Sequence, residues 1–120
     1  MPKFMVILHN PPNVWKDLPP DEAQQTIARY QAWMEGIRAA GRYVAGEKLL
    51  EDGGKRLTRQ AGQLNVIDGP FSEAKEVVGG FFILRAASFD EAVELMRNSP
   101  FLDECRVELR QTDPMGCGGD

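Results

Sequence analysis

The sequence is short of the residues from which metal centres and nucleophilic active sites are usually built. It contains one histidine, His9, and two cysteines, Cys105 and Cys117, which form no CxxC pair. These residues are too few for a zinc site made of Cys and His ligands, and any catalytic triad has to use His9. We expect Cys105 to be a small core residue and Cys117 an exposed thiol, rather than a disulfide pair. No metal and no cofactor are predicted.

Long apolar runs and a basic excess are missing as well. No apolar segment approaches the ~20 residues that span a bilayer, and the apolar run near the N-terminus is shorter than a signal-peptide core. The formal charge is −4, from 14 basic and 18 acidic residues, which disfavours direct binding to nucleic acid. We therefore expect a cytoplasmic protein with no membrane contact.

What is present suits one globular domain. The 120 residues are 42% hydrophobic and 27% charged, as is usual for a folded domain of this size. We predict a single domain over residues 1–112, followed by a flexible C-terminal tail over residues 113–120.

Two segments have the capping-box pattern that begins a helix. In this pattern an acceptor side chain is followed three residues later by Glu or Gln, and the two examples are Asp21 with Gln24 and Ser88 with Glu91. Apolar residues follow both at helical spacing. The first helix is expected to end at Gly41 and the second before Pro100. Six segments are rich in β-forming residues and are bounded by turns, namely 3–9, 43–50, 55–59, 63–68, 81–87 and 106–111.

The order of these elements predicts an α+β, ferredoxin-like β-α-β-β-α-β fold with an inserted hairpin. Two helices on one face of the sheet leave the other face uncovered. Strand 81–87 nevertheless has apolar residues on both faces, with Phe81 and Ile83 on one and Phe82 and Leu84 on the other. A second copy of the chain is the simplest cover for the open face. We predict a homodimer that forms a dimeric α/β barrel.

A long motif lies in the second half of the chain. The segment DGPFSEAKE, residues 68–76, is followed directly by VVGGFFI, residues 77–83. Together they resemble the signature of the DGPF proteins, which belong to the YCII-related family of the dimeric α/β-barrel superfamily. Weaker similarity runs from residue 25 to residue 110. The resemblance implies the same fold and the same dimeric barrel.

The resemblance implies two kinds of function. Some YCII-related proteins are lyase-like enzymes, one of which removes chloride from a chlorinated hydroxyquinol, whereas some DGPF proteins are associated with alternative sigma factors. The enzyme branch often has a histidine in the first helix, paired with an aspartate. Tyr30 occupies the corresponding position here, so that a His–Asp mechanism does not transfer directly.

His9 and Asp68 are the candidate catalytic residues. His9 ends the first strand, where an imidazole suits proton transfer near neutral pH; alternatively, it is an edge histidine that bonds a loop carbonyl. Asp68 ends an apolar strand before a Gly-Pro turn. It is either a carboxylate at the rim of a pocket or the acceptor that fixes the turn, and the two roles are compatible.

Charged residues near this motif are candidates for substrate binding. Lys75 would attract an anion and Glu76 would supply a second carboxylate, unless their charges simply pair in a solvated loop. Arg59 and Arg85 suit a carboxylate or a phenolate. For Arg85, a structural ion pair with Glu108 is the alternative.

Tyr30 is the remaining candidate for substrate binding. With Trp33 and Met34 it forms part of the apolar side of the long helix, which is either core or an aromatic patch that holds a planar ligand beside a cleft. Gly79-Gly80 is not a phosphate loop, because we expect it to precede a strand rather than a helix N-terminus.

Two functions follow from these observations. In the first, a cleft of the dimeric barrel binds or transforms a small polar or aromatic acid by acid–base chemistry without a cofactor. In the second, the chain is a non-catalytic interaction module linked to sigma-factor-type transcription control. An enclosed pocket with converging polar groups favours the first, and an apolar patch beyond the dimer face favours the second.

Overall fold

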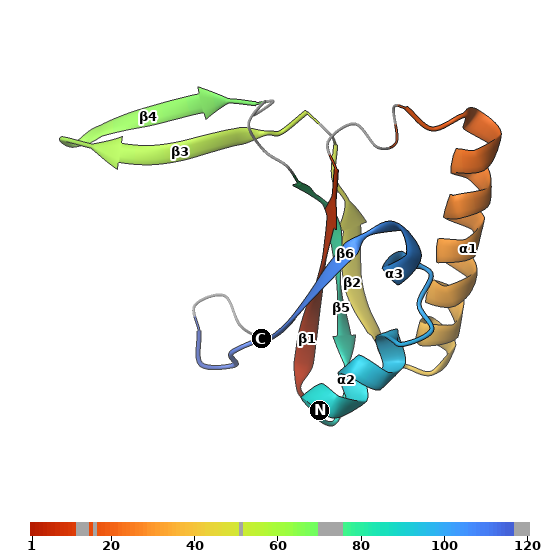
Figure 1. The fold of residues 1–120 in the computed structure, drawn as a ribbon. Helices are drawn as coiled ribbons and strands as arrows, with labels where there is room; N and C mark the ends of the chain where they lie inside the picture. The colour runs from red at the N-terminus through yellow and green to blue at the C-terminus, as the bar shows by residue number, and fades with distance from the viewer. Residues whose placement is uncertain (12–14, 16, 51, 70–75, 117–120) are drawn as a thin grey trace.

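The computed structural model describes the whole chain except residues 12–14, 16, 51, 70–75 and 117–120. The described elements follow the predicted order, with one short extra helix (Figure 1): β1 (Lys3–Asn10), α1 (Pro20–Ala39), β2 (Tyr43–Lys48), β3 (Lys55–Gln60), β4 (Gln63–Asp68), β5 (Val77–Arg85), α2 (Phe89–Met96), α3 (Phe101–Glu104) and β6 (Arg106–Gln111).

The main sheet has four antiparallel strands in the order β2-β5-β1-β6, and β3 and β4 pair separately as a hairpin. This is the ferredoxin-like arrangement that the sequence predicted. One prediction about β5 is wrong, because the strand begins at Val77 and Gly79-Gly80 therefore lie inside it. Val77 and Val78 pair with Asn10 and His9 of β1, across an irregularity in the register between Leu8 and His9.

The two predicted capping boxes have different outcomes. The Ser88 hydroxyl accepts a hydrogen bond from the backbone N–H of Glu91 at 3.1 Å, as predicted for the start of α2. The box predicted at Asp21 does not form, because α1 begins one residue earlier, at Pro20, and no side chain caps it. Proline is pre-organised for the first position of a helix and needs no partner for an N–H there.

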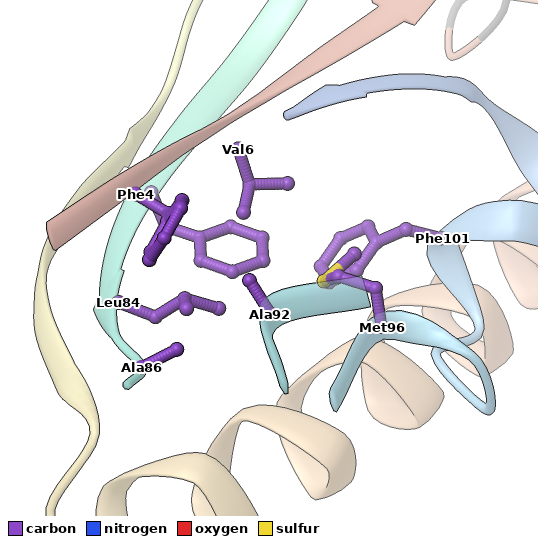
Figure 2. Close-up of a cluster of buried hydrophobic side chains, with 8 residues drawn as sticks. Phe4, Val6, Leu84, Ala86, Ala92, Met96 and Phe101 are labelled. Atoms are coloured by element: carbon purple, nitrogen blue, oxygen red, sulfur yellow. The ribbon is translucent and has the colours of Figure 1, made fainter. Parts of the chain in front are cut away.

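The core lies between the sheet and the helices. Alternate residues of the two central strands, Phe4 and Val6 from β1 and Phe82 and Leu84 from β5, point to the same face and are almost fully buried. Figure 2 shows side chains from the sheet meeting those from α2 and α3 in this core, among them Ala92, Met96 and Phe101.

The opposite face of the sheet has no helix on it. In Figure 1, α1, α2 and α3 all lie on one side of the sheet. The residues that alternate with the core, including Met5, Ile7, Phe81 and Ile83, are only half-buried in a single chain. Because strand side chains alternate between faces, these four form one apolar surface. We call it the open face.

The β3–β4 hairpin leaves the sheet on the side of the open face (Figure 1). Leu57 pairs with Val66, and Leu64 lies beside them on the same face of the hairpin. These three apolar side chains are exposed. An isolated two-stranded hairpin is marginally stable in water, so this apolar side is a second surface that a partner would stabilise. In the described part of the chain, no helix is both long enough and apolar enough to cross a membrane.

Candidate functional site: a cleft between α1 and the sheet

A cleft of about 280 Å³ opens between α1 and the β2–β5–β1 part of the sheet. Its size suits one small ring, since a water molecule takes ~30 Å³ and pockets for drug-sized ligands begin near ~300 Å³. It lies on the helix-covered side of the sheet, next to the core.

The floor of the cleft is made of glycines. Gly46 of β2 and Gly79 and Gly80 of β5 all line it. A Cβ atom at Gly46 would lie 2.7 Å from the Phe82 Cβ, and one at Gly80 would lie 3.0 Å from the Glu47 carbonyl oxygen. Neither glycine has a positive φ angle. Close packing, rather than backbone conformation, therefore calls for glycine at these positions, and it leaves the floor free of side chains where α1 crosses it.

Aromatic side chains form the walls. The Tyr30 ring of α1 stacks on Phe101 of α3, with ring centroids 4.2 Å apart. Trp15, in the segment before α1, meets the edge of Tyr30 at 6.2 Å. Tyr30 and Met34 both pack against the core and line the cleft. This helix face therefore belongs to the core and also lines a cleft.

Cys105 and Tyr30 form a polar contact inside the cleft. The Tyr30 hydroxyl lies 3.9 Å from the Cys105 sulfur. Burial, reinforced by the nearby Cys105, raises the pKa of Tyr30 above its ordinary value. Burial also raises the pKa of the Cys105 thiol. Both groups therefore keep their protons at neutral pH, so Tyr30 is able to donate a hydrogen bond and Cys105 is not an activated nucleophile.

Charged groups lie at the rim. The Lys48 ammonium is 5.4 Å from the centre of the Trp15 ring, and the Arg38 guanidinium is 4.5 Å from the centre of the Tyr43 ring. Both side chains are exposed. Arg38 also pairs with Glu35 at 3.1 Å. Cations held against aromatic rings are stabilised there. Tyr43 and Lys48 are the first and last residues of β2, so the two cations lie at opposite ends of the rim, and each end suits an anion.

Sequence reasoning identified Tyr30 but missed the other polar residues of the cleft. Asn10, Lys48 and Arg38 were not among the candidates, although all three line it. A signal for Asn10 was present in the sequence. It continues the alternation of Phe4, Val6 and Leu8, which places its amide on the core face of β1.

His9 lies on the other side of the sheet, facing away from the cleft. Its Nε2 is 2.9 Å from a carboxylate oxygen of Glu108 on β6, so its partner is an acidic side chain rather than a loop carbonyl. Arg110 binds the other oxygen of Glu108 at 3.1 Å. These two contacts hold the pKa of Glu108 below its usual value, with the hydrogen bond from His9 making the largest contribution.

Glu76 belongs to the same region. Its carboxylate accepts hydrogen bonds from Arg106 of β6 at 2.9 and 2.7 Å. This bond is the main cause of the lowered pKa of Glu76, and His9 contributes through its charge. The partner of Glu76 that the described residues show is therefore a residue of β6, and not another charged residue of the loop that contains Glu76. Lys75 lies outside the described residues.

The ion pair with Glu108, which was the alternative role for Arg85, does not form. In the register of the sheet, Arg85 of β5 lies opposite Lys3 of β1, whereas Glu108 of β6 lies opposite Ile7 of β1. These positions are four residues apart along β1, or ~13 Å at the usual strand rise. The distance is too long for a salt bridge, and Arg85 is exposed at the end of the sheet.

Asp68 and Arg59 lie on the hairpin. The Asp68 carboxylate binds the Lys55 ammonium at 2.5 Å, and both side chains are largely exposed. Arg59 lies opposite Leu64 in the hairpin register, on the same face of the hairpin as Asp68 and closer to the β3–β4 turn. Within the described residues, Asp68 forms no hydrogen bond or ion pair with His9, and no cluster of three His, Cys, Asp or Glu side chains is placed to hold a metal ion.

The fold and the cleft together define a small ferredoxin-like α+β protein with an aromatic-walled cavity beside its sheet. The chain belongs to the YCII-related domain family, whose model matches residues 2–115. This confirms the resemblance seen in the DGPF segment. A curated relative, the uncharacterized protein R00369 of Rhizobium meliloti (strain 1021), is 45% identical over 42 residues, which make up 35% of this chain and 34% of that protein. The match thus spans about a third of the relative's length.

A solved structure has the same fold. It is the 5-chloro-2-hydroxyhydroquinone dehydrochlorinase TftG from Burkholderia phenoliruptrix AC1100, in complex with 2,5-dihydroxybenzoquinone. The two are 20% identical, the TM-score is 0.56, and the match covers 98% of this chain and 99% of the other. At this identity the likeness shows the fold.

Proposed function

We propose that this protein binds a small aromatic acid in the cleft between α1 and the sheet, and that it does so as a homodimer. The observation that carries the proposal is the combination of a glycine floor, aromatic walls and cations at the rim. A flat floor and stacked rings favour a planar ligand, and Lys48 and Arg38 favour an anionic one.

The structural neighbour supports the choice of a small ring. TftG is described in complex with a dihydroxybenzoquinone, which is a single oxygenated ring. The cleft of the present chain, at about 280 Å³, has room for a ligand of that size.

The homodimer is supported by the open face and the hairpin. Met5, Ile7, Phe81 and Ile83 form an apolar surface that the described helices leave uncovered, and the hairpin extends on the same side. Two copies related by a two-fold axis would cover each other's open face with the same residues, and the two sheets would then form the barrel.

We propose proton transfer on the open face of the sheet. Within one chain, this is the side of the sheet opposite the ligand cleft. The observation that favours proton transfer there is the His9–Glu108 contact at 2.9 Å, because an imidazole oriented by a carboxylate is a common acid–base pair. This pair lies on the side of the sheet that the second copy would cover. Asp68, on the exposed hairpin, is proposed as the second acid–base group, and it would meet His9 through the partner copy.

Thermal unfolding with a panel of aromatic carboxylates and phenols tests the binding proposal. A ligand at ~100 times its dissociation constant stabilises the folded state by about 2.7 kcal/mol, which raises the unfolding temperature by several degrees. Lys48→Met should reduce the shift for carboxylates, whereas Lys55→Met, which removes the same charge from the hairpin, should leave it unchanged. The absence of a shift with every compound would contradict the binding proposal and favour the interaction module.

A further inference from the structure

Asn10 is a polar side chain in an apolar position. It is 6% exposed and follows the core residues of β1 onto the same face of the sheet. Within the described residues its carboxamide forms no hydrogen bond, and yet its polar atoms are not sealed from solvent. It lines both the cleft and a smaller adjoining pocket.

A buried amide without a partner calls for an explanation. Leaving such a group unpaired costs about 1–3 kcal/mol, and an apolar side chain of similar shape would remove that cost. An amide that is buried among apolar groups but open to a cavity suits a role in which the cavity's occupant supplies the missing bonds.

The absence of a side chain at Gly79 leaves room for this amide. A Cβ atom at Gly79 would lie 2.2 Å from the Asn10 Nδ2 and 3.2 Å from its Cγ. The φ angle of Gly79 is not positive, so the backbone does not itself call for glycine. The amide therefore occupies the space that a side chain at position 79 would fill.

Lys48 lies across the floor from Asn10. Lys48 is on β2 and Asn10 is on β1, with β5 between them, and Lys48 pairs with Gly80. Two strand spacings across the sheet, or ~10 Å, and two residues along it, or ~7 Å, separate the two backbone positions, because Leu8 and not Asn10 pairs with Gly80. Within the described residues Lys48 has no carboxylate partner. The Asn10 amide lies against Gly79. A single ring lying over Gly79 and Gly80 would therefore place one end near the cation and the other near the amide.

We propose that Asn10 is the specificity-determining residue of the cleft, and that the ligand class is a single-ring aromatic carboxylate with a hydroxyl group at the far end of the ring. The inference rests on the proposed function. Lys48 binds the carboxylate, the ring lies on the glycine floor, and the Asn10 carboxamide forms hydrogen bonds with the hydroxyl group, accepting through Oδ1 or donating through Nδ2.

Benzoate and 4-hydroxybenzoate are matched probes for this assignment, because they differ only in the hydroxyl group. Calorimetric titration of the full chain should show at least ~10-fold tighter binding of 4-hydroxybenzoate, since a site built to hydrogen-bond a hydroxyl group discriminates against ligands that lack it. Asn10→Leu, of similar shape, should abolish this preference and leave benzoate binding within about threefold of wild type.

A glycine pair supplies the matched control. Gly79→Ala should displace the amide and reduce the preference for 4-hydroxybenzoate. Gly36→Ala lies on the exposed side of α1, where a Cβ atom meets nothing within 4 Å, and should leave both affinities unchanged. If wild type binds both probes equally, the role of Asn10 is overturned while ligand binding stands. If it binds neither, both proposals are overturned.

Nuclear magnetic resonance keeps the test decisive if Asn10→Leu does not fold. In the ¹⁵N-labelled wild-type protein, the side-chain NH₂ resonances of Asn10 should move on addition of 4-hydroxybenzoate and move much less with benzoate. Unchanged Asn10 side-chain resonances at saturating 4-hydroxybenzoate would overturn the assignment.

Discussion

The two faces of the main sheet carry similar apolar side chains but differ in what covers them. Phe4 and Val6 are fully buried beneath the helices, whereas Met5 and Ile7, one residue along the same strand, are only half-buried. The first pair stabilises the single chain. The second pair gains little until another surface covers it. One strand therefore contributes to folding through one face and, in the proposed homodimer, to association through the other.

The largest expected effect is on the helix-covered face. Phe4→Ala should lower the free energy of unfolding by about 3–5 kcal/mol, because it leaves a cavity in a core that cannot fully collapse. Met5→Ala, on the adjacent strand position, should cost less than half as much in dilute protein. Urea denaturation measures both. Equal losses of unfolding free energy in the two variants at low protein concentration would mean that both faces of the sheet contribute equally to the stability of the single chain.

A charge on the open face should affect association rather than folding. Ile83→Asp places a carboxylate on the surface that the second copy is proposed to cover, and burying an unpaired charge costs several kcal/mol. Sedimentation should show a dimer for wild type and a monomer for the variant, with similar circular dichroism spectra. A variant that remains dimeric would place the interface elsewhere.

The two helix starts give a smaller contrast. Ser88→Ala removes the hydrogen bond to the Glu91 N–H and should cost about 1 kcal/mol. Asp21→Ala removes no capping bond, because α1 has none from a side chain; only its favourable interaction with the helix dipole is lost, at about 0.3–1 kcal/mol. Thermal denaturation of both variants tests the order. A larger loss at Asp21 would contradict the described start of α1.

The smallest effect is expected from Glu108. Its folded-state pKa is lowered by His9 and Arg110, so the stability that it contributes is present above the ordinary glutamate pKa of 4.5 and is lost as pH falls through the lowered value. The unfolding midpoint of Glu108→Gln, compared with wild type, should therefore differ less at pH 3 than at pH 6. A difference that does not change with pH would contradict the lowered pKa.

The order of strands and helices was predictable because it depends on local periodicity. The run of β-forming residues in 3–9 and the helical spacing after Pro20 are properties of short windows, and both elements occur as expected. The start of α1 was wrong because two competing signals, a proline at the first position and a capping box one residue later, lie side by side. The short helix α3 was missed because four residues are too few to show a period.

The cleft was predictable only in part, because it is built by pairing across strands. Tyr30 was found from its helix face. Lys48 and Asn10 meet the same cavity only because β2 and β1 flank β5, and neither has a motif of its own. His9 and Asp68 were expected together at this site, but His9 lies on the open face of the sheet and Asp68 on the hairpin, and neither lines the cleft. Strand order and register decide these relationships, and neither is a local property of the sequence.

The position of the ligand site on the helix-covered face can be tested by titrating the ¹⁵N-labelled protein with 4-hydroxybenzoate and following the ¹⁵N resonances. The backbone amides of Gly46, Gly79 and Gly80 fall in the well-separated glycine region and all line the cleft. If the ligand lies on the helix-covered face, these three amide resonances should move along a single saturating curve, while those of His9 and Glu108 on the other face should change little. Shifts concentrated at His9 and Glu108, with the three glycines unchanged, would contradict this position of the site.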